Sequence, residues 1–204
     1  ISQTKTINKD VIRPLNKPIY EEGSLAVLKG NLAPDGCVIK PAACEKKFFK
    51  HKGPAIVFNS YPEMKEIIDR DDLDVTENHI LVLRNVGPVG GPGMPEWGMM
   101  PTPKKLLKRG IRDMVRISDA RMSGTSYGAC ILHVAPESFI GGPLSLLETG
   151  DIIEIDIELR SINMLVDKKI LSLRRKKIRP KKPKAGRGWL WMYSNHVTQA
   201  NNGC

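Results

Sequence analysis

The chain has few cysteines and no long apolar run, and both shortages narrow its possible functions. Its four cysteines, Cys37, Cys44, Cys130 and Cys204, include no CxxC pair and no zinc-finger spacing. A disulfide framework and a self-contained zinc site are therefore disfavoured. No run approaches the ~20 apolar residues that a membrane span needs, and no signal peptide opens the chain. The expected compartment is a reducing cytoplasm.

Length and composition favour a globular protein. The chain has 204 residues, of which 41% are hydrophobic and 26% are charged, and this composition does not fit wholesale disorder. The length suits one domain with an appendage. The chain starts at Ile1 without a Met and stops at Cys204 after an apolar stretch, so we expect it to be a piece of a longer protein.

The net charge of +10 comes from one short segment. Residues 168–187 hold 11 Lys or Arg and no Asp or Glu, which leaves the other 184 residues with a net charge of −1. Charge runs of this kind are commonly solvated, and the segment is predicted to be an exposed connector. The alternative is a noncatalytic domain that uses this run to bind nucleic acid or another polyanion. We disfavour it because the run lacks interleaved aromatic side chains.

Short strand-like runs separated by turns, with few helices, predict a β-rich α+β domain, a barrel flanked by helices. The predicted strands are 25–28, 37–40, 55–58, 79–83, 114–117, 151–157 and 161–166. Helices are expected after the capping box at Ser60, after Thr102, and over 189–198, where Trp and Met side chains would dock. The predicted divisions are an extended lead-in at 1–23, a barrel domain at 24–166, the basic connector at 167–187 and a truncated C-terminal helix at 188–204.

The segment 86–103 contains five Gly and five Pro directly after the strongest predicted strand. Glycines let backbone amides approach a ligand closely, and prolines stiffen a loop. Glu96 is its only carboxylate, with no cation nearby in the sequence. Glu96 is either an exposed loop residue, which its spacing favours, or a metal or substrate ligand on a rigid loop.

A second loop of small hydroxyl residues and glycines follows the strand that is predicted to end at Ile117. Ser123 lies in this loop but not in a GxSxG elbow, and no Ser–His–Asp set accompanies it. From the residues alone, Ser123 is expected to be a turn residue. Asp119 and Arg121 could form a local ion pair, and His133 is expected to be a satisfied core histidine.

Several motifs recur in the order of a known family. They are DVIRPL at 10–15, NLAPDG at 31–36, GPAIVF at 53–58, LRNVGPVGGPGMPE at 83–96, SDARMSGT at 118–125, HVAPES at 133–138, GGPL at 141–144 and HVTQAN at 196–201. Together they resemble the C-terminal region of the dihydroxy-acid and phosphogluconate dehydratases, in its sugar-acid branch. The basic run at 171–184 is expanded relative to the usual family pattern.

The resemblance implies a fold, a reaction and cofactors. The fold is a β-barrel with flanking helices, similar to the swivelling domain of aconitase-type enzymes. The reaction is dehydration of a 2,3-dihydroxy acid, either a sugar acid or a branched-chain acid, to a 2-keto acid. An iron–sulfur cluster (2Fe–2S or 4Fe–4S) would help the C3 hydroxide to leave, and Mg²⁺ would stabilise the enolate formed at C2.

The resemblance also assigns residues. Ser123 would be the catalytic base, Glu96 a magnesium ligand, and Ser123, Gly124 and Thr125 would bind substrate; the two loops should therefore lie close together. No iron–sulfur ligand falls in this chain. The implied partners are a missing N-terminal dehydratase domain, a small dihydroxy acid and a second copy in a homo-oligomer, so the fragment alone should be inactive. A pseudoenzyme fragment kept as an interaction module is a further alternative.

Overall fold

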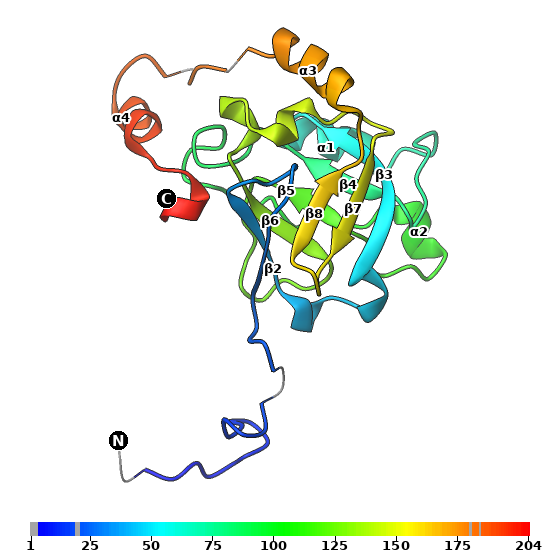
Figure 1. Ribbon diagram of the computed structural model, residues 1–204, viewed down its shortest axis with the longest axis vertical. Coiled ribbons are helices and arrows are strands. Elements are labelled where there is room, and N and C mark those ends of the chain that lie inside the picture. Colours follow the sequence, from blue (N-terminus) through cyan, green and yellow to red (C-terminus); the bar gives the residue numbers. More distant parts are fainter. Residues whose placement is uncertain (1–3, 19–20, 180, 184) are drawn as a thin grey trace.

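The computed structural model describes residues 4–18, 21–179, 181–183 and 185–204 (Figure 1). Its strands are β1 (Ala26–Leu28), β2 (Gly36–Ile39), β3 (Lys50–Phe58), β4 (Ile80–Leu83), β5 (Arg116–Ser118), β6 (Cys130–Ala135), β7 (Ile152–Asp156) and β8 (Ser161–Met164). Its α-helices are α1 (Tyr61–Ile67), α2 (Lys104–Lys108), α3 (Lys168–Lys177) and α4 (Trp189–His196). Short 3-10 helices cover Pro41–Ala43, Lys46–Phe48, Ser138–Ile140, Pro143–Leu146 and Ala200–Asn202.

The eight strands form one mixed sheet that curls into a nearly closed barrel (Figure 1). The strand order is β1-β2-β6-β5-β4-β3-β7-β8. Strands β3, β4, β5 and β6 run parallel, while both ends of the sheet are antiparallel. The β-rich α+β barrel predicted from the sequence is confirmed.

The barrel closes where the two edge strands meet, between the end of β1 and the start of β8. The Lys29 amide donates to the carbonyl of Arg160 over 2.9 Å, and the carbonyl of Lys29 accepts from the Ile162 amide over 3.1 Å. Gly30 follows directly, and a Cβ placed there would overlap the carbonyl oxygen of Ile162. This seam pairs edge groups that would otherwise be open to solvent or to another chain.

Gly30→Ala is expected to lower the free energy of unfolding by about 1–3 kcal/mol, because the new methyl group forces the seam apart. The measurement is chemical denaturation followed by circular dichroism. Gly186→Ala is the matched control, since a Cβ there meets no atom within 4 Å. Equal stability of the two variants would contradict the close contact.

Two apolar clusters lie on opposite faces of the sheet. One cluster takes residues from all eight strands and fills the barrel, and Ile80 and Val82 of β4 belong to it. The alternate residues Leu81 and Leu83 join the second cluster, beneath α1 and α2. Because both faces of β4 are buried, its continuous apolar sequence is what a central parallel strand requires.

Most predicted strands and helices appear within a few residues of their expected bounds. Ser60 caps α1 as predicted, with its hydroxyl accepting from the Glu63 amide. Strand β6 was not expected, and β3 is longer than predicted. The predicted docking of the last helix is wrong: Trp189, Trp191 and Met192 of α4 remain 77%, 43% and 49% exposed.

The basic segment is largely exposed, as predicted for a solvated run, but its first half is the helix α3, which was not expected. The Asp167 side chain caps α3 by accepting from the Lys169 amide. Arg174 on α3 forms ion pairs with Asp151 and Glu148. Parts of the predicted lead-in and connector, namely 1–3, 19–20, 180 and 184, lie outside the described residues.

Candidate functional site

Two loops leave the same end of the barrel. Strand β4 leads into the Gly- and Pro-rich loop, and β5 leads into the loop that contains Ser123. The two strands are parallel neighbours, with Leu83 paired to Ser118. Because the carboxyl ends of parallel neighbours meet at one edge of a sheet, the loops start side by side.

Arg121 joins these two loops. Its guanidinium lies 3.3 Å from the Glu96 carboxylate, and its Nε donates to the carbonyl of Met94 over 2.7 Å. The Arg121 carbonyl accepts from the Gly98 amide over 2.8 Å. The loops that contain Glu96 and Ser123 are therefore in direct contact. The ion pair anticipated between Arg121 and Asp119 is wrong, since Arg121 pairs with Glu96 instead.

Asp119 instead fixes the start of the Gly-rich loop from inside the protein. Its buried carboxylate accepts from the amides of Asn85 and Val86 and from the hydroxyl of Ser138. Burial raises the pKa of Asp119, while these hydrogen bonds favour its charged form. Its role is to hold the backbone where the loop leaves β4.

Glu137 supports the same loop further along. Its fully buried carboxylate accepts from the amides of Val89 and Gly90, each over 2.9 Å, and from the Gln199 side chain over 2.7 Å. Desolvation raises the pKa of Glu137, and the three donors oppose that shift. A Cβ at Gly87 would press against the Glu137 side chain, so glycine is required for this close approach.

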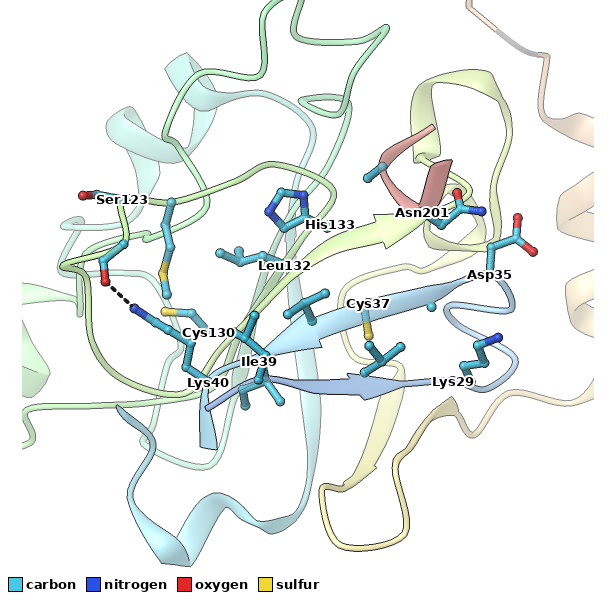
Figure 2. A pocket seen from close by; sticks show the side chains of 17 residues that line it. Lys29, Asp35, Cys37, Ile39, Lys40, Ser123, Cys130, Leu132, His133 and Asn201 are labelled. Carbon is cyan, nitrogen blue, oxygen red and sulfur yellow. Dashed lines mark hydrogen bonds between the residues drawn. The ribbon is translucent and has the colours of Figure 1, made fainter. Parts of the chain in front are cut away.

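Ser123 is partly exposed at the edge of a pocket. Its hydroxyl lies 3.0 Å from the Thr125 hydroxyl and 3.4 Å from the Thr125 amide nitrogen. The Ser123 carbonyl accepts from the Ser126 amide, which closes a tight turn. This is the turn geometry expected of Ser123 from the residues alone, and the residue lines the rim of the pocket, with its hydroxyl directed outward in Figure 2.

The pocket has a volume of about 630 Å³ and lies between the β1–β2 hairpin, the Ser123 loop and the C-terminal segment (Figure 2). Its walls combine apolar side chains with Lys40, Ser123, His133 and Asn201. An apolar cavity with a few converging polar groups is typical of a small-molecule site. Gly124, expected to bind substrate, lines the pocket with Ser123, whereas Glu96 and Thr125 are not among its lining residues.

His133 differs from the satisfied core histidine that the sequence suggested. The residue lines the pocket, is partly exposed and has a positive φ of 57°. Its backbone amide donates to the carbonyl of Ala120, and its ring makes no hydrogen bond to any described residue. Burial and the nearby charge of Arg121 lower the pKa of His133, so the neutral ring faces the pocket at neutral pH.

The described residues supply at most one ligand for a metal ion. Glu96 offers one exposed carboxylate, a suitable single oxygen ligand for a divalent cation. Within the described ranges, no three His, Cys, Asp or Glu side chains are grouped to hold a metal. Burial raises the pKa of Cys37 and of Cys44 to about 12, so these thiols do not suit a cluster that needs thiolates.

None of the helices in the described part of the chain has the length and apolar character needed to cross a membrane.

The sequence did not identify three residues that hold the loops in place, namely Arg121, Glu137 and Lys40. No local pattern marks them, because their partners are distant in the sequence.

Comparisons with known proteins agree with the sequence motifs. Residues 10–204 match the sequence model of a family described as Dihydroxy-acid/6-phosphogluconate dehydratase C-terminal. The chain is 51% identical to 6-deoxy-6-sulfo-D-gluconate dehydratase of Pseudomonas putida, with 96% of this chain and 34% of that protein covered. It is 44% identical to L-arabinonate dehydratase of Rhizobium leguminosarum, at the same 96% and 34% coverage. It is 40% identical to dihydroxy-acid dehydratase of Methanococcus aeolicus, with coverage of 100% and 36%. The chain thus spans about a third of the length of these relatives.

Proposed function

The chain belongs to the dihydroxy-acid/6-phosphogluconate dehydratase C-terminal family, and from that premise we propose that it is the C-terminal third of a hydro-lyase. The complete protein would dehydrate a 2,3-dihydroxy acid to a 2-keto acid. The observation that carries this proposal is Ser123, which lines the edge of a pocket on a loop joined by Arg121 to the loop of Glu96.

Ser123 is the proposed base for the proton at C2 of the substrate. A serine hydroxyl is a weak base, so its surroundings must favour the alkoxide. The Thr125 amide donates to that oxygen over 3.4 Å, and the Thr125 hydroxyl, 3.0 Å away, is placed to donate to it as well. Gly124 lines the pocket wall beside Ser123 and leaves its backbone accessible to substrate.

Glu96 is the proposed protein ligand from this chain for Mg²⁺, which when bound would stabilise negative charge on the substrate oxygens. The other magnesium ligands and the iron–sulfur cysteines would come from the remainder of the polypeptide. Arg121 pairs with Glu96 and keeps its loop against the Ser123 loop.

A sugar acid is the proposed substrate class. The DARMSGTSYG sequence at 119–128 is closer to the sugar-acid members than to the DGRFSG form typical of the branched-chain enzymes. Two of the relatives reported above are named as sugar-acid dehydratases. We further propose a cytoplasmic homo-oligomer, in which the missing N-terminal domain covers this end of the barrel.

The test is a 2-keto acid assay on the complete protein after reconstitution with iron, sulfide and Mg²⁺. Sugar acids and branched-chain dihydroxy acids are compared as substrates, and the 204-residue chain alone is assayed in parallel. We expect turnover of sugar acids by the complete protein and none by the chain alone. Absence of turnover from a fully loaded complete protein would refute the proposal. A steeply salt-dependent, specific complex with DNA would favour the nucleic-acid alternative.

Glu96→Gln in the complete protein is expected to weaken the affinity for Mg²⁺ and to lower activity, with partial recovery at high Mg²⁺. The substitution keeps the size of the side chain but removes the charge that favours a hard cation. The measurement is the Mg²⁺ dependence of kcat. Glu45→Gln, at an exposed ion pair with Lys47 away from the pocket, is the control. An unchanged Mg²⁺ dependence would remove Glu96 from the ligand set.

A further inference from the structure

Lys40 reaches from the end of β2 to the loop that contains Ser123. Its ammonium donates to the Gly124 carbonyl over 2.9 Å and to the Ser126 carbonyl over 2.6 Å. Figure 2 shows this side chain at the lower left, directed from the end of its strand toward the loop, with a dashed line marking one of these bonds. At most one of the three ammonium N–H groups remains for another partner.

No acidic side chain among the described residues neutralises the charge of Lys40. Lys40 forms no ion pair with any carboxylate in the part of the chain that the structure describes. Lys40 is only partly exposed, and it lines the same pocket as Ser123. A cation whose partners are two carbonyl oxygens keeps most of its field, and a partly enclosed pocket screens that field less than open water does.

The position of Lys40 is itself fixed by the backbone. The Lys40 carbonyl accepts from the Ala43 amide, and the Ala43 carbonyl accepts from the Gly128 amide over 2.9 Å. The segment 40–43 is thus attached to the far end of the Ser123 loop, while the ammonium holds its middle. These attachments, at Gly124, Ser126 and Gly128, restrict the turn that follows Ser123.

We propose that Lys40 is a positioning residue for the dehydration reaction, which holds the Ser123 turn through the Gly124 and Ser126 carbonyls and adds an unneutralised positive charge to the pocket that Ser123 lines. This inference rests on the proposed function and adds to it a source of activation from within this chain. A positive charge near a hydroxyl stabilises its anion, and the same charge stabilises the anionic substrate intermediate.

Other titratable groups near Ser123 have to be considered in a pH experiment. The pocket and the adjoining loop contain Lys29, Asp35, Cys37, Glu96, Arg121, Cys130 and His133. These groups are present in both the parent enzyme and a Lys40 variant. The difference between the two pH profiles therefore reports on Lys40, and the parent profile alone does not.

The experiment measures kcat, KM and their pH dependence for Lys40→Met and Lys40→Arg in the complete, cofactor-loaded enzyme. Lys40→Met should lower kcat by roughly 10²-fold with a smaller change in KM, as for loss of one preorganised electrostatic contact. Because the Ser123 hydroxyl becomes less acidic without the cation, the loss should shrink as the pH rises. Lys40→Arg retains the charge and should recover part of kcat. Lys52→Met, on an exposed part of β3 outside the pocket, is the matched control.

Three results would overturn the inference: a parent-like kcat in Lys40→Met, a loss of kcat that is constant with pH, or a Lys40→Arg variant as impaired as Lys40→Met. If Lys40→Met does not fold, Lys40→Gln keeps a donor without the charge and is judged by the same criteria. If the parent enzyme lacks dehydratase activity, the proposed function fails. An active parent with an unaffected Lys40→Met variant refutes only the role of Lys40.

Discussion

Ser123→Ala in the complete enzyme is expected to lower kcat by roughly 10²–10⁴-fold with little change in KM, the range for loss of a positioned acid–base group. The methyl side chain cannot accept the C2 proton, while the backbone turn that closes through the Ser126 amide is kept. Steady-state kinetics with matched iron, sulfide and Mg²⁺ content provide the measurement. Cofactor content should be unchanged, because Ser123 is not proposed as an iron ligand.

The control is Ser172→Ala, the same chemical change on the exposed surface of α3. It should retain the parent kcat. If Ser123 only shaped its own turn, Ser123→Ala would lose a little stability and keep nearly normal turnover. Near-normal kcat in a folded, cofactor-loaded Ser123→Ala enzyme would leave the base unassigned.

Asp113→Ala is expected to lower the free energy of unfolding by about 3–5 kcal/mol, because it leaves the charge of Arg116 buried without a counterion. The two side chains are 4% and 2% exposed and lie 3.1 Å apart. Asp113 also accepts from the amide of Ala129, while Arg116 donates to the hydroxyl of Thr102. Arg116 Nε is buried without a hydrogen-bond partner among the described residues. This site therefore has few groups that could replace the lost carboxylate.

Denaturant unfolding of the parent and the variant measures this loss. Asp72→Ala is the control, since Asp72 pairs with Arg70 at the surface, where both side chains are more than half exposed. Exposed ion pairs contribute little, so this variant should unfold near the parent midpoint. An Asp113→Ala protein as stable as Asp72→Ala would show that Arg116 finds compensation elsewhere.

The sequence predicted those elements whose signals are local. The apolar run of β4 and the Ser60 cap of α1 can be identified without knowledge of their neighbours. Helix α3 was missed because a basic run of this kind is commonly an irregular connector, and the support of Arg174 comes from Asp151 and Glu148, which lie 23 and 26 residues earlier in the chain. Strand order was beyond prediction, since pairing depends on partners that one sequence does not identify.

The candidate site also combines features that the sequence identifies with contacts that it does not. Resemblance to the dehydratase family identified Ser123 and Glu96, although their roles remain predictions. The bond between Glu96 and Arg121 could not be inferred, because it depends on β4 and β5 being parallel neighbours. Lys40 was missed for a similar reason, since 84 residues separate it from Gly124.

The contact between Glu137 and Gln199 has a consequence for synthesis on the ribosome. Glu137 holds the amides of Val89 and Gly90, and Gln199, 62 residues later in the chain, completes its set of donors. While the nascent chain is shorter than this, the Glu137 carboxylate lacks one donor and the loop that leads to Glu96 is incompletely supported. During synthesis the loop therefore gains the last of these supporting donors only after Gln199 has been added and has left the exit tunnel.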